Sequence, residues 1–428
     1  MEKKNSPKLF LQVKENLFLI IPMACIVLWA IIFLIMTLFN PIFNNFQFIY
    51  FDYKIWYGAG QQIHKDATKL YSTDYGYDIS YTWMPCWAMI FAFSLSLIPY
   101  AIGYFILYTI NILSGILFVR EFNKILLLYD VKKKMHRFLF LIIISNGFVI
   151  LNIFMQNQTK LMVALIIFYI LRREIHYRKG GIEKNFKYNL INYFLFVFMI
   201  GMAPYFIFLL LIYIFQDIKF KDVLKKDNMK IYAIVLSMFL IQNILFIIFP
   251  VLIFEFLEGF SKNANFFIFY LSEWLLFTDL QITVINSIST IILAIITLIL
   301  LLKTELKIEL KFAYFALVAI FIGLFANRVL SILLPLILLI FIQFLKQHFE
   351  GIEFIKQNKI LLIGIVSIAG IYLNVNAETI YSIAIIILPF LAGPVLMFFI
   401  FLRWIILLSI MACSLLKLIL SYNKEIEL

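Results

Sequence analysis

The apolar run LFLIIPMACIVLWAIIFLIMTLF, Leu17–Phe39, decides how the rest of the chain can fold. A helix of this length can cross the hydrocarbon core of a bilayer. The run is too long for the apolar core of a signal peptide, and it lacks a small-residue cleavage site, so we expect a retained anchor. The N-terminus is predicted to lie on the cytoplasmic side, because four lysines precede the run: Lys3, Lys4, Lys8 and Lys14.

The composition extends this conclusion to the whole chain. Hydrophobic residues make up 64% of the 428 residues and charged residues only 14%. A soluble protein could not bury that much apolar surface, so the excess must face lipid. The apolar runs are continuous rather than alternating, which indicates helices rather than a barrel of strands. We expect an all-α polytopic membrane protein, a single transmembrane domain over residues 1–428 with about 12–14 transmembrane helices.

The basic residues predict which segments face the cytoplasm. The formal net charge is +12, and Lys and Arg gather in short segments between apolar runs. This is the pattern of cytoplasmic loops and does not indicate a nucleic-acid partner. If both runs Met84–Ile98 and Tyr100–Val119 cross, these segments fall on the outer side, so either one of the two does not cross or a later apolar run is misassigned. Met84–Ile98 is the shorter, so we expect it to lie along or dip into the outer leaflet.

Two polar segments, residues 40–84 and 255–287, are then assigned to outer loops. The first contains the stretch IYFDYKIWYGAGQQIHKDATKLYSTDYGYDISYTWMP, residues 49–85. It is rich in tyrosine and carries four aspartates. The three cysteines and four histidines show no disulfide or metal-ligand spacing, so no metal is expected. The polar chemistry of the chain is therefore predicted at the outer face.

Asp52 is the first candidate for chemistry. If Tyr50–Gln62 forms a helix, Asp52, Trp56 and Gly60 share one face of it. A carboxylate held near the membrane, where aromatic side chains limit water, can have a raised proton affinity and take a proton from an attacking hydroxyl. The alternative is an aspartate that caps the N-terminus of an interfacial helix.

The aromatic residues of this stretch also have two interpretations. Tyrosine and tryptophan gather at membrane–water interfaces, where they anchor a protein. Their flat faces can also pack against the apolar faces of pyranose rings. The aromatic residues with these two interpretations are Tyr50, Tyr53, Trp56, Tyr57, Tyr71, Tyr75, Tyr77, Tyr81 and Trp83, and the selected candidates for substrate binding are Tyr53, Trp56, Tyr57, Tyr81 and Trp83.

A set of short motifs resembles the N-terminal signature of glycosyltransferase family eighty-seven. These motifs are Asp52-Tyr53-Lys54-Ile55-Trp56-Tyr57-Gly58-Ala59-Gly60, Leu70-Tyr71, Tyr81-Thr82-Trp83-Met84-Pro85 and Ile98-Pro99. The family consists of polytopic GT-C-type enzymes that use polyprenyl-phosphate sugars, so the resemblance implies a GT-C-like helical bundle whose first outer loop forms short interfacial helices. It also implies that Asp52 is the general base and that the outer turn containing Asn157 and Gln158 binds substrate.

The chain departs from this pattern where the family often has Lys-Pro in a later outer turn. Here the residues are Ala203-Pro204, so the phosphate of the donor lacks its expected cation. The outer-side candidates to replace that cation are Arg328, Lys160, His64 and Lys54. Glu273 is a further candidate, which could line the site from the second outer loop.

The resemblance implies an inverting hexosyltransferase, mannose-like in specificity. It would move a sugar from a polyprenyl phosphate to a lipid or glycan acceptor at the outer face of the plasma membrane, with no cofactor. One alternative is a flippase or transporter of lipid-linked saccharides, which would place polar residues deep within several helices. Another is an oligosaccharide polymerase or ligase, which would depend on outer arginines and histidines.

Overall fold

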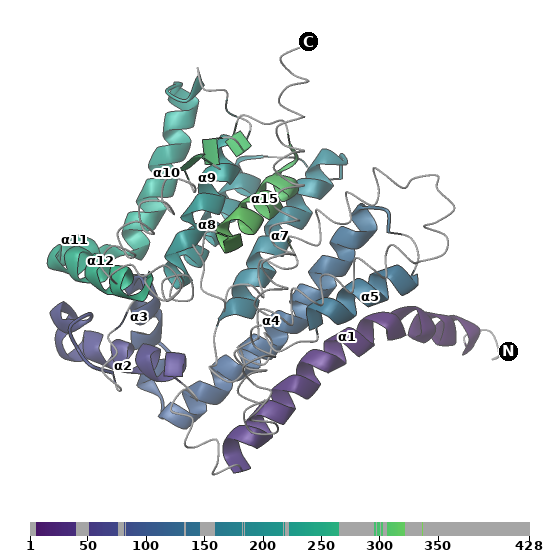
Figure 1. The fold of residues 1–428 in the computed structure, drawn as a ribbon, viewed down its shortest axis with the longest axis horizontal. Coiled ribbons are helices and arrows are strands. Elements are labelled where there is room, and N and C mark those ends of the chain that lie inside the picture. The colour runs from purple at the N-terminus through teal and green to yellow at the C-terminus, as the bar shows by residue number, and fades with distance from the viewer. Residues whose placement is uncertain are drawn as a thin grey trace, which may run out of the picture. The chain divides into compact units, whose positions relative to one another are not determined.

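The computed structural model places part of the chain, and all structural statements concern that part: residues 6–39, 51–75, 81, 83–131, 134–145, 159–181, 183, 185–216, 218, 222–264, 295–296, 298–299, 301–302, 306–321 and 336. These residues form helices joined by turns and contain no strand (Figure 1), which confirms the all-α prediction for this part. Four candidate site residues lie outside the described residues: Asn157, Gln158, Glu273 and Arg328. So does the predicted second outer loop beyond Ala264.

The chain folds into two compact units. The helices of the first unit are α1 (Ser6–Phe39), the part of α4 (Tyr100–Leu128) that follows Ile106, α5 (Lys134–Ser145) and α7 (Lys160–Arg178). Within this unit α1 packs against α5, and the Tyr108 hydroxyl of α4 donates to the Ala30 carbonyl of α1 at 2.6 Å.

Helix α4 alone among the described helices is both long and apolar enough to cross a membrane. The predicted run ended at Val119, but the helix continues to Leu128 through charged residues. Its extension is stable because Glu121 accepts from Lys124 on the same helix and from Arg172 of α7. A hydropathy run therefore marks the apolar part of this helix and not its end.

The second unit contains the polar stretch that follows the first apolar run. Its helices are α2 (Phe51–Asp66), η2 (Ala67–Lys69), α3 (Pro85–Ala92), η3 (Leu95–Leu97), the start of α4, α8 (Phe186–Met202), η4 (Pro204–Phe206), α9 (Ile207–Phe215), α10 (Lys226–Gln242), α11 (Ile244–Ile248), α12 (Val251–Ala264) and α15 (Ile308–Phe321). Helix α2 packs against α3, which in turn contacts α8 and α11 (Figure 1).

Helix α3 bears on the predicted topology. It begins with Pro85 at its first position, where the missing N–H has no intrahelical partner to lose. Its 8 residues are followed by a turn and η3, so it is only about 12 Å long at 1.5 Å per residue. This length is too short to cross a bilayer, in agreement with the prediction that Met84–Ile98 does not span.

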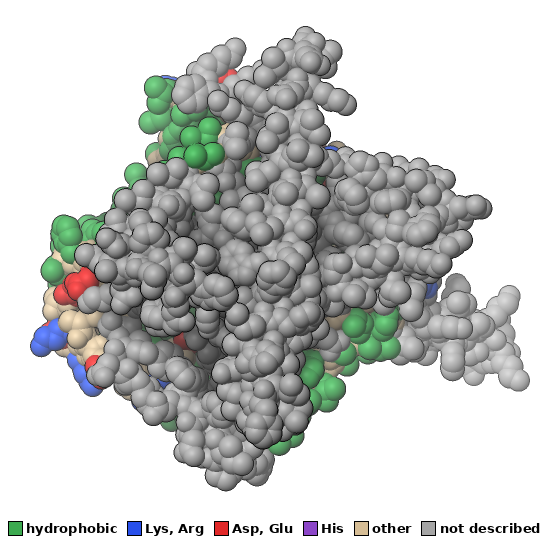
Figure 2. Space-filling view, viewed as in Figure 1, with side chains coloured by type: hydrophobic (Ala, Val, Ile, Leu, Met, Phe, Trp, Pro, Cys, Tyr) green, Lys and Arg blue, Asp and Glu red, His purple; other side chains and the backbone are tan. Residues whose placement is uncertain are grey.

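One predicted helix is wrong. The apolar run Ile231–Phe254 is long enough to predict a single crossing helix, but the structure divides it into α10, α11 and α12. The breaks fall at Asn243, whose backbone leaves the helical region, and at Pro250, which has no N–H to continue a helix. Hydrophobic side chains remain exposed on α10 and α12, among them Ile241 at 73% and Phe254 at 73% (green in Figure 2).

Candidate ligand cavity on helix α2

Helix α2 has two chemically different faces. It begins with Asp52 in its first turn and ends with His64 and Lys65 in its last, so its charges complement the helix dipole. One face is buried: Asp52, Trp56 and Gly60 all lie within the second unit, which confirms the shared face predicted from their spacing. The other face borders a cavity.

The buried face of α2 is held by aromatic packing. Tyr53 is fully buried, and its ring meets Tyr100 and Tyr104 edge-on at centroid distances of 5.0 and 5.4 Å. Edge-to-face packing of this kind is favoured by the ring quadrupoles and adds to the burial energy. The start of α4 is therefore fixed against α2.

A second aromatic cluster surrounds Trp56, which is 2% exposed. Its ring makes edge contacts with Trp83 at 5.5 Å and Trp87 at 5.6 Å, and a tilted contact with Phe91 at 5.8 Å. This cluster joins α2 to α3 and to the residues just before it. Trp83 and Trp56 thus pack on each other rather than on the cavity.

Hydrogen bonds tie α2 to the connection between α3 and α4. The Tyr53 hydroxyl donates to the Tyr100 carbonyl at 3.1 Å, and the Tyr57 hydroxyl donates to the Ile98 carbonyl at 2.9 Å. In return, Ser96 Oγ donates to the Tyr57 carbonyl at 2.9 Å. The bond to Ile98 satisfies a carbonyl in the break before α4, and the other two bonds join that break and the start of α4 to α2.

The tyrosines beyond α2 secure the rest of the segment in the same way. The Tyr71, Tyr81 and Tyr75 hydroxyls donate to the carbonyls of Trp83, Met84 and Leu70 at 2.8, 2.8 and 2.7 Å. Burial raises the pKa of all three phenols above the usual value, so they stay protonated and remain donors.

Two glycines allow the close packing around α2. A Cβ on Gly60 would lie 2.8 Å from the Ala92 nitrogen and 2.9 Å from the Phe91 carbonyl carbon, so only glycine lets α3 approach this near. A Cβ on Gly58 would lie 2.7 Å from the Tyr75 ring, on the opposite side of the helix. Gly60 therefore serves the packing of two helices, and Gly58 leaves room for a ring beside the cavity.

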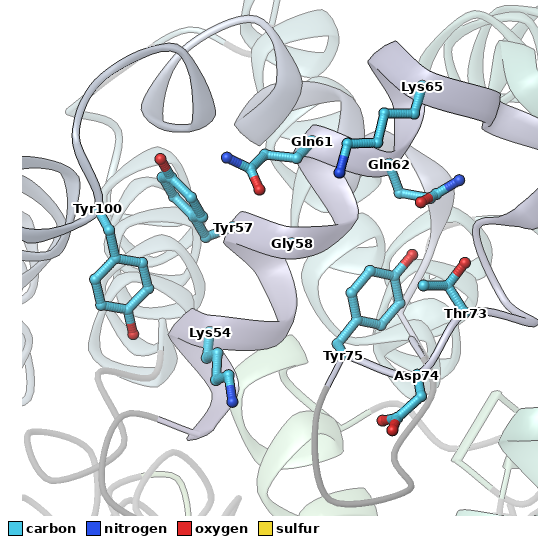
Figure 3. A pocket seen from close by; sticks show the side chains of 10 residues that line it. All are labelled: Lys54, Tyr57, Gly58, Gln61, Gln62, Lys65, Thr73, Asp74, Tyr75 and Tyr100. Carbon is cyan, nitrogen blue, oxygen red and sulfur yellow. The ribbon is translucent and has the colours of Figure 1, made fainter.

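The cavity has a volume of about 540 Å³, a size suited to a small ligand. Its lining residues come from α2, the segment after η2, and the start of α4: Lys54, Tyr57, Gly58, Gln61, Gln62, Lys65, Thr73, Asp74, Tyr75 and Tyr100 (Figure 3). The lining holds two lysines, one aspartate, two amides and three tyrosines. Such a set can bind an anionic ligand that also carries hydroxyl groups.

The charged groups are distributed unevenly around the cavity. Figure 3 shows Lys65, Gln61 and Gln62 toward one end, and Lys54 and Asp74 toward the other. Gln62 donates to the Asp66 carbonyl at 2.9 Å, so its amide is already engaged. Within the described part of the chain, Lys65 has no ion pair and Gln61 has no hydrogen bond from its side chain.

Of the described candidates that the sequence identified, Tyr57, Lys54 and the aromatic Tyr75 line the cavity. Asp52 is 5% exposed and does not line it, and Tyr53 and Tyr81 are fully buried as packing residues. Lys160 belongs to α7 in the other unit.

His64 is not a member of the cavity either. Its Nε2 lies 2.7 Å from the Ala92 carbonyl oxygen, and its ring packs edge-on against Phe93. The side chain is thus engaged in holding α2 to the end of α3.

Six lining residues were not singled out from the sequence: Lys65, Gln61, Gln62, Thr73, Asp74 and Tyr100. The signal for Lys65 and Gln61 was present in α2. Lys54, Gly58, Gln61 and Lys65 follow an i, i+4, i+7, i+11 spacing, which places all four on one helix face. Asp74 carries no such periodicity, because it lies in the segment after η2.

The site offers no ligand set for a metal, since the described residues contain no group of three or more His, Cys, Asp or Glu that could hold one. Comparison with known proteins adds no family: no protein-family model and no curated protein matches the chain. The resemblance to glycosyltransferases therefore rests on the short motifs around α2.

Proposed function

We propose that this chain is an integral-membrane glycosyltransferase that moves a hexose from a polyprenyl-phosphate sugar to a lipid or glycan acceptor at the outer face of the membrane. The observation that supports it most is the cavity on α2. The segment that carries the family-like motifs is also the segment whose residues line a cavity of suitable chemistry. Its polytopic GT-C-like topology is part of the same proposal.

The lining suits a sugar phosphate. Lysine side chains bind phosphate oxygens as point charges, and amide and carboxylate groups bind sugar hydroxyls. Tyr57, Tyr75 and Tyr100 add ring surface, on which the apolar face of a pyranose can rest. A purely apolar lipid would offer no hydrogen-bonding or charged group to Lys65 and Gln61, which is unfavourable.

The reaction needs a carboxylate that takes the proton of the acceptor hydroxyl. The acceptor oxygen attacks the anomeric carbon opposite the phosphate, and the bond from that carbon to the phosphate oxygen breaks. The phosphate leaves with the electron pair, and the proton passes to the carboxylate. By resemblance this carboxylate is Asp52, whereas Asp74 is the carboxylate that lines the cavity.

A transfer assay tests this proposal. Vesicles that contain the full-length protein are given polyprenyl-phosphate mannose or glucose, and labelled glycolipid is measured for wild type, Asp52→Asn and Asp74→Asn. Loss of transfer in one folded variant that still binds the donor identifies the base. Transfer that survives in both variants would show that neither aspartate is the base, and wild-type vesicles that transfer no sugar would contradict the function.

A transporter of lipid-linked saccharides is the second candidate. It is favoured by amides buried inside helices, since Asn111 of α4 is fully buried and Asn192 of α8 donates to the Tyr213 hydroxyl at 2.7 Å. Polar groups at such positions can mark a substrate path. The two functions are separated by the product: a transporter moves the labelled lipid across the vesicle membrane and forms no new glycosidic bond.

A further inference from the structure

We propose that Lys65 and Gln61 form the phosphate-binding end of the α2 cavity, and that Asp74 lies at the opposite, hydroxyl-binding end. The ligand is a phosphate ester that lies along α2, with its anion at Lys65. This inference rests on the proposed function for the identity of the ester as a lipid-linked sugar. The site itself is argued from the cavity alone.

Lys65 differs from the neighbouring cations in having no protein partner among the described residues. Lys69, one turn further on, forms an ion pair with Asp66 at 3.6 Å. His64 is held by the Ala92 carbonyl. A lysine that borders a cavity without a counter-ion retains its positive charge for a ligand.

Gln61 supports the same assignment. It precedes Lys65 by four residues, so the two side chains lie next to each other on one face of α2. Its amide N–H groups can donate to a second phosphate oxygen, beside those bound by the ammonium group. Figure 3 shows both side chains at the same end of the cavity.

The remaining lining residues set the direction of the ligand. Gly58 has no side chain, so the Tyr75 ring packs directly over it. This ring and that of Tyr57 line the middle of the cavity, where they offer ring surface to a sugar (Figure 3). Asp74 and Lys54 then face the far end of the sugar. The charges of Asp74 and Lys54 offset each other at that end, whereas Lys65 leaves the other end positive, so the phosphate is favoured at Lys65. The Asp74 carboxylate can accept from sugar hydroxyls.

The charge of the lining fits the same class of ligand. Two lysines and one aspartate give the ten lining residues a net charge of +1. A sugar joined to a prenyl chain through one phosphate is a diester with a single negative charge. Lys65 thereby fills the role of the cation that the family pattern would place at Ala203.

Binding to the purified full-length protein in lipid nanodiscs tests the assignment. The probes are a short-chain polyprenyl phosphate, inorganic phosphate and the matching polyprenol without phosphate. We expect Lys65→Gln to weaken polyprenyl-phosphate binding by roughly tenfold or more, the effect of one charge-assisted hydrogen bond. Lys65→Arg should restore binding, and Lys69→Gln, which removes a lysine outside the cavity, should leave it unchanged.

The three probes distinguish a lipid-linked phosphate from free phosphate. Together with the transfer assay, they also distinguish failure of the Lys65 site from failure of the proposed enzyme activity. Polyprenyl phosphate that binds more tightly than inorganic phosphate, with both weakened by Lys65→Gln, supports a lipid-linked ligand at Lys65. Polyprenol binding should not depend on Lys65. A folded Lys65→Gln variant that binds polyprenyl phosphate as the wild type does would overturn the site, even if sugar transfer by the wild type upheld the enzyme. The converse result, a Lys65-dependent phosphate site without transfer from any prenyl donor, would retain the site and reject the enzyme.

Discussion

The Glu121 carboxylate near the end of α4 and the Lys65 ammonium group at the α2 cavity have opposite relations to the described residues around them. In the first unit, Glu121 is bound from two sides, by Lys124 at 2.6 Å and by Arg172. In the second unit, Lys65 and Gln61 border a cavity, and the described residues provide no partner for either side chain. The first set is neutralised within the protein, and the second is left to bind a ligand.

This difference shows how to separate structural charges from functional ones in a chain with few charges. A basic cluster between apolar runs is typical of membrane topology, and the Glu121 network fits that interpretation. Functional charges are instead recognised by a cavity and by the lack of a protein partner. Four substitutions test this difference between structural and functional charges and the packing around the cavity, in order of decreasing expected effect.

Trp56→Ala should be the most damaging change to the cavity. It removes a nearly fully buried ring that packs on Trp83, Trp87 and Phe91, and such truncations lower the free energy of unfolding by about 3–5 kcal/mol. Thermal unfolding in detergent measures the loss. Phe93→Ala is the control, because Phe93 is 68% exposed and its truncation should change stability little. An equal loss of stability in the two variants would contradict the role of the aromatic cluster around Trp56 in holding α2 to α3.

Gly60→Ala should destabilise by about 2 kcal/mol, because the added methyl group meets the backbone of α3. Gly58→Ala is the comparison variant, since its methyl group meets a side chain, the Tyr75 ring, rather than the backbone of another helix. We expect the Gly58 variant to remain folded and to lose ligand affinity, because the displaced ring enters the cavity. The free energy of unfolding and probe binding are measured for both variants.

Glu121→Gln should lower the free energy of unfolding by about 1.5 kcal/mol, since Arg172 and Lys124 lose their charged acceptor. Polyprenyl-phosphate binding should not change, because the network lies in the other unit and borders no cavity residue. Chemical unfolding and the nanodisc binding assay check the two parts. Reduced binding by a stable variant would end the distinction between the two charge sets.

Asp66→Asn should have the smallest effect and should depend on pH. Hydrogen bonding to the Thr68 hydroxyl lowers the pKa of Asp66 in the folded state. A lowered folded-state pKa stabilises the protein above the unfolded pKa, about 3.9, and this stabilisation is lost as pH falls through the folded-state pKa. The wild type should exceed the variant in unfolding temperature at neutral pH and approach it as the pH falls below about 4. An unfolding-temperature difference between wild type and variant that grows as the pH falls would contradict this expected pH dependence.

The sequence predicted the helical class and much of the helix framework. The run Tyr188–Ile200 corresponds to α8 and Tyr205–Phe215 to α9, because Pro204 interrupts a continuous apolar pattern. The sequence did not show the division of Ile231–Phe254. A single Asn and a single Pro stand in an otherwise apolar run there, and hydropathy alone does not register the backbone break.

The candidate site was predicted in its location but only partly in its residues. The 3.6-residue period correctly grouped Asp52 with Trp56, but that face proved to be the buried one. A helix period cannot tell which face will pack, since the decision depends on partners such as Phe91 that come much later in the chain. The polar Lys65 face became the lining of the cavity for the same reason.

The tyrosine hydrogen bonds of α2 also have a consequence for biosynthesis. Their acceptors at Ile98 and Tyr100 follow the donors by only 41 and 47 residues, so this part of the second unit can assemble before α8 has been synthesised. Tyr71 is different, because its ring packs on Phe246 and Phe256, which are translated far later. The lysine-bearing face would thus form early during translation, and the arrival of α11 and α12 would complete the packing behind it.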